Sequence, residues 1–362
     1  MASIIGNKIK VSVFGESHGP AIGMVMDSPP AGLKLDFEEI YRELSRRAPG
    51  NDPTATKRKE PDIPEFLSGL KDGVTTGAPL AAIIRNTSQH SKDYSELERK
   101  PRPSHADFAA NIHFGGFNDI AGGGHFSGRL TAPIVIAGAI LKQYLKTKGI
   151  TIGGHILSIG KEKDTPLDPV AVSGEELERL SRLSFPVVNA NAEAKMRNEV
   201  AQAAEIGDSV GGVLELAVTG ISAGFGGPMF DGVENIISKA VFGIPAVKGI
   251  EFGDGFNISS LRGSQANDGM RYENGKVVCT TNHSGGITGG ITNGMPIIFR
   301  TALKPTPSIS LSQQTVDLYD KSNTTLSIKG RHDPCIVLRA LPAIEAVTAI
   351  ALSNLLDEGA LF

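Results

Sequence analysis

The chain has 362 residues, of which 40% are hydrophobic and 21% are charged, the balance of a soluble globular protein. The formal net charge of -3 is nearly neutral and Trp is absent, so neither a basic field nor stacking aromatics favour nucleic-acid binding. Two cysteines are too few for a disulfide framework or a four-ligand zinc site, and no signal peptide or long apolar run is found. These features predict a cytoplasmic protein without a metal site or a membrane span.

The predicted elements begin with two neighbouring strands and a helix. Residues 8–14 alternate polar and apolar side chains, and residues 22–27 form a second short apolar run. Asp36 is a suitable helix cap, and the helix continues to about Arg47. Further strands are predicted at 80–86, 211–219 and 247–252, and further helices at 129–147, 174–184, 191–206, 233–242 and 342–356.

The segments between these elements are polar or rich in glycine. Residues 51–65 are predicted to form a basic loop, and residues 88–126 a loop whose length is more often functional than idle. Strands come in neighbouring pairs more often than in β-α-β alternation, and no linker or repeat divides the chain. The sequence therefore predicts one α+β domain over residues 1–362, with mostly antiparallel sheets covered by helices.

Glycine is enriched, with 43 residues in the chain, and it gathers with His, Ser and Arg in four segments. The first is 15–19, directly after a strand. The second is 102–107, and the third is 122–129, which leads into a predicted helix. The fourth combines the proline-stiffened run 304–308 with the run 330–335, where a cation, an imidazole and a carboxylate are neighbours.

Each segment has a functional and an ordinary interpretation. His18 at a strand end can reach a cleft and titrates near neutral pH, but Ser17 and His18 also suit a simple turn. Glycines before a helix offer backbone N–H groups to an anion, with Arg129 as a bidentate partner, yet they also suit tight turning. The spacing fits neither a P-loop nor a dinucleotide fingerprint. Arginines near all four segments favour a small polyanionic ligand.

Seven runs, in order and over nearly the whole chain, resemble the chorismate synthase family. They are GESHGPAIGMVMDSPPAG (15–32), RPSHAD (102–107), GGGHFSGRLTAP (122–133), GIEFGDGF (249–256), NHSGGITGGITNGMP (282–296), KPTPS (304–308) and GRHDPCIVLRALP (330–342). The resemblance implies a β-α-β sandwich, a homotetramer and reduced FMN as cofactor. It also implies an anti-1,4-elimination of phosphate from 5-enolpyruvylshikimate 3-phosphate to chorismate, without net redox change.

The resemblance also implies roles for individual residues. His18 would protonate the departing phosphate, His105 would act on the reduced flavin near N1, and Asp333 would help flavin N5 accept the ring proton, with Ser17 and Ser127 supporting this relay. FMN contacts would fall on His125, Phe126, Ser127, Ala246, Gly289, Lys304, Pro305, Thr306, Pro307, Ser308 and Arg331. Substrate phosphate and carboxylates would meet Arg47, Arg102, Arg129 and Arg339.

The chain departs from the family pattern at three places. Ala48 stands where a third arginine is common, which weakens any claim to a pyridine-nucleotide phosphate site at this edge. Ser104 stands where glycine is common. His125 stands where arginine is common, so we expect FMN or substrate affinity to vary with pH in the range where an imidazole titrates.

Two other functions remain open at the level of sequence. The first is a flavoprotein reductase with its own NAD(P)H site, which needs a strand-glycine-helix nucleotide-binding unit that the sequence lacks. The second is a non-catalytic phosphate- or nucleotide-binding module, which would not need two loop histidines and Asp333. Family members also differ in whether they reduce their own FMN with NADPH or rely on a flavin reductase as partner.

Overall fold

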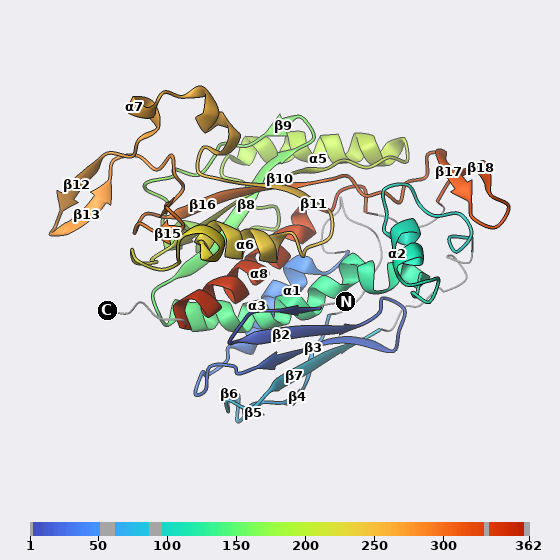
Figure 1. The fold of residues 1–362 in the computed structure, drawn as a ribbon, viewed down its shortest axis with the longest axis horizontal. Coiled ribbons are helices and arrows are strands. Elements are labelled where there is room, and N and C mark those ends of the chain that lie inside the picture. The colour runs from blue at the N-terminus through green and yellow to red at the C-terminus, as the bar shows by residue number, and fades with distance from the viewer. Residues whose placement is uncertain (1–2, 51–61, 87–95, 329–332, 358–362) are drawn as a thin grey trace.

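Two antiparallel five-stranded sheets lie on either side of a layer of helices (Figure 1). The computed structural model describes residues 3–50, 62–86, 96–328 and 333–357. Within these residues, every pairing between the strands of the two sheets is antiparallel. This arrangement confirms the predicted α+β class and the β-α-β sandwich.

The first sheet is built from the N-terminal part of the chain. Its spatial order is β1 (Ile4–Ile5), β2 (Lys10–Gly15), β3 (Ala21–Asp27), β7 (Leu80–Arg85) and β4 (Glu65–Ser68). Along β7 the buried residues Leu80, Ala82 and Ile84 alternate with more exposed ones, the period of a strand with one face in the core. Two short strands, β5 (Leu70–Lys71) and β6 (Val74–Thr75), pair with each other between β4 and β7 in the chain.

The second sheet comes from the middle of the chain. Its order is β11 (Val247–Phe252), β16 (Ile297–Leu303), β10 (Gly212–Thr219), β8 (Thr151–Ile159) and β9 (Glu162–Lys163). The register places Glu215 of β10 opposite both His155 of β8 and Arg300 of β16. His155 Nε2 lies 3.0 Å from Glu215 Oε2, and Arg300 Nε donates to Glu215 Oε1 at 2.9 Å. A row of charged side chains thus crosses three strands.

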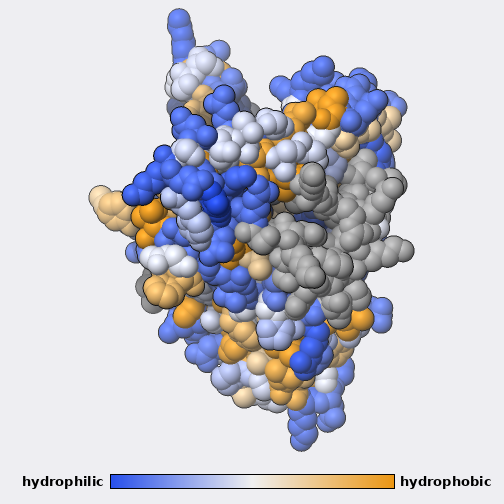
Figure 2. Space-filling model, turned by 90° about the vertical axis from the view of Figure 1, so that its right-hand side faces the viewer, coloured by the Kyte–Doolittle hydropathy of each residue, from blue (hydrophilic) through white to orange (hydrophobic). Residues whose placement is uncertain are grey.

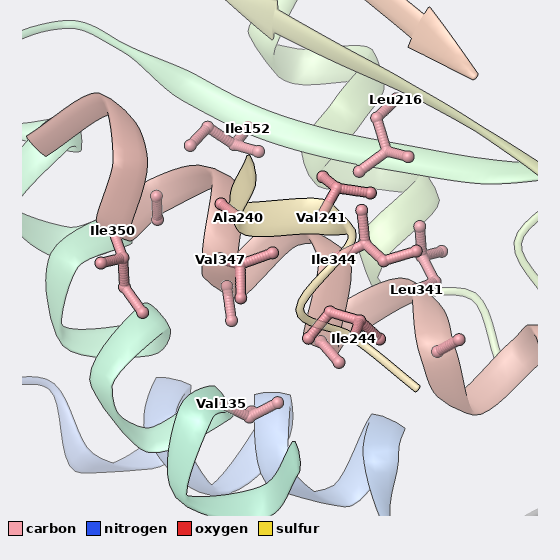
Figure 3. Packing of buried hydrophobic residues seen from close by; sticks show 14 of the residues in the cluster. Val135, Ile152, Leu216, Ala240, Val241, Ile244, Leu341, Ile344, Val347 and Ile350 are labelled. Atoms are coloured by element: carbon pink, nitrogen blue, oxygen red, sulfur yellow. The ribbon is translucent and has the colours of Figure 1, made fainter. Parts of the chain in front are cut away.

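Helices α1 (Phe37–Arg47), α3 (Thr131–Lys146), α6 (Val233–Val241) and α8 (Val337–Asp357) lie between the sheets (Figure 1). Asp36 caps α1, as predicted, because its Oδ1 accepts the Glu39 N–H at 3.2 Å. The central helix is α8, and Figure 3 shows its side chains among those of α3, α6 and the second sheet. The α8 residues labelled there are Leu341, Ile344, Val347 and Ile350, and they face Val135, Val241, Ile152 and Leu216.

The remaining elements lie outside this layer. The helix α4 (Gly174–Ser181) packs on β8, and α5 (Ala190–Glu205) lies over the second sheet (Figure 1). The helix α2 (Asp107–His113) is followed by the 3-10 turns η2 (Ala121–Phe126) and η3 (Gly128–Leu130). Outlying pieces are η4 (Met229–Asp231), η5 (Gly255–Ser260), α7 (Gly263–Ala266) and the hairpins β12 (Met270–Glu273)–β13 (Lys276–Cys279), β14 (Ile287–Thr288)–β15 (Ile291–Thr292) and β17 (Gln313–Asp317)–β18 (Ser322–Leu326).

Most predicted elements are confirmed within a few residues, and the exceptions have physical causes. The described part of the predicted loop 88–126 holds α2 and η2, so the prediction of a continuous loop was wrong. The strands β8 and β16 were not predicted. The last helix begins at Val337 rather than at 342, and Pro342 lies inside it. Residues 51–61 of the predicted basic loop lie outside the described residues.

The helix α8 is the described helix whose length and hydropathy would also suit a membrane span. Its segment Val337–Leu356 is long and apolar enough to span a membrane by length and composition. However, 89% of that segment's apolar window is buried inside the fold. The apolar character of α8 is therefore that of a core helix between two sheets.

Candidate functional site

A cavity of about 620 Å³ opens at the end of the helical layer where α3 and α8 begin. This is a typical volume for a small-molecule site. All four segments singled out in the sequence contribute to its wall, together with the end of α1 and the connection between α6 and β11. Figure 2 looks onto the side of the molecule that carries α2 and β17–β18, where hydrophilic surface is interrupted by separate hydrophobic patches.

Ser17 and His18 lie on a turn that is fixed from two sides. The strand β2 ends at Gly15, whose φ of +94° favours glycine and turns the chain. The Ser17 backbone N–H donates to the Gly124 carbonyl at 3.2 Å. The Asn86 side-chain amide donates to the carbonyls of Glu16 and Gly19 at 3.1 and 2.7 Å. The turn therefore holds its serine and histidine in place against the residues 122–124.

The two predicted catalytic histidines lie against neighbouring residues of one glycine run. A Cβ at Gly122 would lie 2.6 Å from His18 Cδ2, and a Cβ at Gly123 would lie 3.3 Å from His105 Cε1. Both glycines have positive φ, +62° and +86°. The positive φ favours glycine at both positions, and at Gly122 a side chain would also collide with the His18 ring. The lack of side chains lets both rings approach the same strip of backbone.

The segment Arg102–Asp107 is a closed hydrogen-bonded unit. The Asp107 carboxylate accepts from Arg102 Nε at 2.7 Å and from Arg102 Nη2 at 2.8 Å, and its Oδ1 lies 2.5 Å from His105 Nδ1. Arg102 Nη1 also donates to Ser308 Oγ at 3.2 Å. Burial alone would raise the pKa of Asp107, but the hydrogen bonds from Arg102 and His105 outweigh it and hold that pKa well below its usual range.

Arg47 and Arg129 share one buried carboxylate, that of Asp62. Arg129 Nη1 lies 2.5 Å from Asp62 Oδ1, and Arg47 Nε lies 3.1 Å from Asp62 Oδ2. The two arginines are only 2% and 7% exposed, yet both line the cavity. Arg129 Nε also donates to Asn86 Oδ1 at 3.1 Å, which links this pair to the turn that carries His18. One carboxylate thus holds two guanidinium groups of this wall.

Asp333 and Arg339 form an ion pair at the cavity wall where α8 begins. Arg339 Nε donates to the Arg47 carbonyl at 2.9 Å, so this pair is tied to the end of α1. Arg46 points elsewhere, because its guanidinium binds the buried carboxylate of Glu345 at 2.7 and 2.8 Å. The predicted FMN contact Arg331 lies outside the described residues.

His125, which stands in place of the family's usual arginine, lines the cavity and is held by two hydrogen bonds. Its Nδ1 lies 2.8 Å from the Gly15 carbonyl oxygen, so Nδ1 must carry a proton, and its Nε2 lies 2.7 Å from Ser3 Oγ. Phe126 and Ser127 also line the cavity, and Ser127 Oγ accepts the Arg129 N–H at 3.3 Å. The expected pH dependence of ligand affinity stays a prediction.

Two residues other than glycine have left-handed backbone at the cavity wall, Ser104 with φ +60° and Ala246 with φ +72°. Such backbone favours glycine, which explains why glycine suits the position of Ser104. Lys304 joins the two: its backbone N–H donates to the Ala246 carbonyl at 3.0 Å and its Nζ to the Ser104 carbonyl. Burial, together with the nearby charge of Lys248, lowers the pKa of Lys304.

Most of the predicted site residues are brought to this cavity, and a few are not. Thr306, Pro307 and Ser308 line it. Gly289 lies in the turn between β14 and β15 and is not part of the wall, and neither is Pro305. His18 is not part of the wall either, but it lies against Gly122, which is. The sequence reasoning missed three residues that the structure adds: Asp62, Asn86 and Lys248. Asp62 lies inside the predicted basic loop 51–65 and Asn86 ends the predicted strand 80–86, and neither carries a motif. Lys248 follows Ala246 closely enough that its charge was a usable signal.

The arrangement suits a ligand with several negative charges and a reaction that moves protons. Four arginines and two lysines line the cavity, and the carboxylates at its wall or directly behind it are engaged in ion pairs. Two imidazoles lie within the same region. Among the described residues no group of three or more His, Cys, Asp or Glu is placed to hold a metal ion.

Comparisons with known proteins point in one direction. A family model described as chorismate synthase matches residues 9–356. A chorismate synthase of Lancefieldella parvula is 45% identical over 367 residues, covering 98% of this chain and 96% of the relative. One of Thermococcus kodakarensis is 46% identical over 349 residues, covering 96% of each chain. A solved structure titled "Crystal Structure of Chorismate Synthase" superposes with a TM-score of 0.76 at 28% identity, covering 98% of this chain and 93% of that one.

Proposed function

Because the chain belongs to the chorismate synthase family and is a carbon–oxygen lyase, we propose that its cavity catalyses the reduced-FMN-dependent elimination of phosphate from 5-enolpyruvylshikimate 3-phosphate. The observation that carries this proposal is that four arginines and His105 line one cavity, with His18 lying against Gly122 of its wall. The substrate offers a phosphate and two carboxylates, and arginine is the side chain best suited to bind both groups.

The residues present fit FMN beside the substrate. The cavity volume of about 620 Å³ leaves room for a flat ring system. The wall formed by residues 243–247 and Phe126 is largely uncharged, whereas Lys248 and Lys304 put positive charge at one side of it. We propose that His125, Phe126, Ser127, Ala246 and the run 304–308 hold the cofactor, with Arg331 and Gly289 as further contacts. When bound, reduced FMN would supply an electron-rich ring and be recovered unchanged.

The chain's own residues would place the substrate and move two protons. Arg47, Arg129 and Arg339, with Arg102 behind His105, would hold its anionic groups. His18, supported by Ser17, would give a proton to the phosphate as its bond to carbon breaks, because a protonated phosphate leaves more readily. Asp333 would help to take up the ring proton, with Ser127 beside the path. His105 would donate a proton or a hydrogen bond to the cofactor through its imidazole.

The first experiment is anaerobic phosphate release from this substrate, with photoreduced FMN and no pyridine nucleotide. We expect chorismate over many turnovers per flavin. His18→Ala should lose turnover but keep substrate binding, while His113→Ala, an exposed histidine on α2, should change neither. Absence of product with FMN bound would contradict the proposal, and unchanged turnover in His18→Ala would contradict the role of His18.

The flavin-reductase alternative has little support. A dinucleotide site of the usual kind needs a parallel sheet with glycine-rich crossovers, whereas the sheets of the described residues are antiparallel. Oxidation of NADPH by the protein in the presence of FMN alone would favour this alternative or a bifunctional enzyme. If no oxidation occurs, we propose that a separate NADPH-dependent flavin reductase supplies the reduced cofactor.

We also propose that the chain acts in the cytoplasm as one domain and assembles as a homotetramer. The assembly is supported by large apolar side chains left exposed away from the cavity, such as Phe230, Phe256 and Tyr272. Light scattering of the purified protein should give about four times the mass of one chain, and a monomeric mass would contradict this.

A further inference from the structure

Asp107 has no role in the mechanism above, yet its carboxylate is in close contact with His105, which does have one. Its Oδ1 lies 2.5 Å from His105 Nδ1, and its side chain is almost fully buried. A carboxylate oxygen can only accept, and two acceptors at this distance would repel each other. A proton must therefore lie between the two atoms, and because the carboxylate stays ionised beside Arg102, that proton belongs to Nδ1.

A second group lies near the same nitrogen: Arg102 Nη2 is 3.0 Å from His105 Nδ1. With a proton on Nδ1, both atoms are donors and cannot bond to each other. The same Nη2 lies 2.8 Å from Asp107 Oδ1, so its N–H is directed there. Arg102 thus grips the carboxylate rather than the imidazole.

The carboxylate is held from three directions and cannot turn away from the ring. It accepts the Arg102 backbone N–H at 3.0 Å in addition to the two guanidinium contacts. Arg102 is in turn fixed by its Nη1 hydrogen bond to Ser308 Oγ. The support of His105 is therefore anchored to the run 304–308, which is the proposed cofactor wall.

We propose that Asp107 is a positioning residue that keeps His105 in its Nδ1–H tautomer, so that Nε2 is the nitrogen that works in the cavity. This rests on the proposed role of His105. A Cβ built at Gly123 would lie 3.4 Å from His105 Nε2 and 3.7 Å from Ser127 Cβ, so that nitrogen faces the glycine run and the cavity. The neutral ring presents a lone pair there, and the charged ring presents an N–H stabilised by the carboxylate behind it.

The test is Asp107→Asn, which keeps the shape of the side chain. The new amide can donate to His105 Nδ1 and so favours the opposite tautomer. Nitrogen-15 NMR of histidine-labelled protein, at a pH where the ring is neutral, should show Nδ1–H in the unsubstituted protein and Nε2–H in the variant. His105→Gln assigns the signal by its loss. Turnover should fall by about 10²-fold with little change in KM.

The matched control is Asp317→Asn, which removes a buried carboxylate from Arg99 outside the cavity. It should leave turnover and the His105 signal unchanged. In a His105→Gln background, Asp107→Asn should add no further loss of turnover, because its effect runs through His105. If Asp107 had only a structural role, Asp107→Asn would lower turnover by the same factor in the His105→Gln background as in the unsubstituted protein.

The proposal is overturned if His105 carries its proton on Nε2 in the unsubstituted protein, a result that does not require Asp107→Asn to fold. It is also overturned if Asp107→Asn leaves the tautomer or the turnover unchanged. The tautomer is measured without substrate, so it tests the positioning even if no chorismate is formed. Lack of chorismate in the unsubstituted protein contradicts the proposed function instead.

Discussion

At the scale of single residues, the cavity is governed by buried carboxylates that hold arginines. Asp62 is the clearest case, because its carboxylate contacts both Arg47 of α1 and Arg129 of η3. A buried ion pair adds little net stability when intact, but the loss of one partner leaves the other charged and desolvated. Asp62 therefore decides how both guanidinium groups are presented to the ligand.

We predict that Asp62→Asn lowers the free energy of unfolding by about 3–5 kcal/mol, because two buried guanidinium groups lose their carboxylate. Urea denaturation measures this change. The matched control is Glu65→Gln, which breaks the exposed pair between Glu65 and Arg85 and should change stability little. Equal effects of the two substitutions would show that burial of the Asp62 pair is unimportant.

Single residues also show where prediction from sequence reached its limit. The roles predicted for His18, His105 and Asp333 came from the family resemblance, because the local patterns around them suit ordinary turns and loops as well as function. Asp62 lies within the predicted basic loop 51–65 and has no motif, and its importance arises only when α1 and η3 come together in space. The strain at Ser104 and Ala246 was also hidden, because neither residue type signals positive φ.

At the scale of elements, the close packing of α3 on α8 depends on one glycine. A Cβ at Gly138 would lie 2.2 Å from Ala346 Cβ, which no rotamer change can relieve because alanine has none. The helices must therefore touch backbone to backbone at this point. The helix separation at this contact also affects the distance between the N-terminal ends of α3 and α8, where the cavity lies.

We predict that Gly138→Ala lowers stability by about 1–3 kcal/mol, since overpacking forces the two helices apart. Thermal or urea unfolding checks this. Gly263→Ala, at an exposed position with open space around its Cα, should stay within about 0.5 kcal/mol of the parent. Ala346→Gly in the Gly138→Ala background should recover part of the loss. No recovery would mean that the contact is not the cause.

A second prediction at this scale concerns the row of charged side chains across the second sheet, which includes His155, Glu215 and Arg300. Burial lowers the pKa of His155, but hydrogen bonds from its ring to Asp164 and Glu215 outweigh burial and raise it above 6.5. The charged ring faces these two carboxylates, and Arg300 faces Glu215 from the next strand. The ion pairs stabilise the fold fully below the unfolded pKa of about 6.5, and this stability is lost as pH rises through the raised folded value.

The free energy of unfolding should therefore fall as pH rises from about 6.5 through the raised pKa of His155 in the folded protein. In His155→Gln this fall should be much smaller, because the side chain forms hydrogen bonds but has no charge to lose. Urea denaturation at several pH values in this range measures both proteins. An unchanged slope in the variant would assign the pH dependence to other groups.

Elements that the sequence did not reveal have causes of the same kind. Two glycines interrupt the apolar pattern of β8, yet they are needed there. A Cβ at Gly153 would lie 2.9 Å from Leu177 Cβ of α4, and one at Gly154 would lie 2.5 Å from the Glu215 carbonyl oxygen. The last helix was predicted to begin at residue 342. Instead α8 begins at Val337 and accommodates Pro342 near its N-terminal end.

At the scale of the whole molecule, the two ends of the chain are joined by one side chain. Asn354 Oδ1 accepts the backbone N–H groups of Asn7, Lys8 and Ile9 at 3.0, 2.9 and 3.0 Å. Its Nδ2 donates to the Ile9 carbonyl at 3.0 Å. The segment between β1 and β2 of the first sheet is thereby bound to the end of the central helix.

We predict that Asn354→Ala lowers the free energy of unfolding by at least about 2 kcal/mol, because three backbone N–H groups lose their acceptor. The adjacent residue is a matched control. Ser353 Oγ is buried and, among the described residues, has no hydrogen-bond partner, so Ser353→Ala should be neutral or stabilising. Denaturant unfolding of the two variants measures the difference, and a loss in Ser353→Ala equal to that in Asn354→Ala would contradict the account.

The position of α8 at the centre of the sandwich has a consequence for the order of synthesis. Both sheets bury their inner faces against a helix layer whose middle member, α8, follows every strand of the two sheets along the chain. The strands are therefore synthesised before the helix that covers them, so we expect both apolar sheet faces to stay uncovered until the residues up to Asp357 are available to pack.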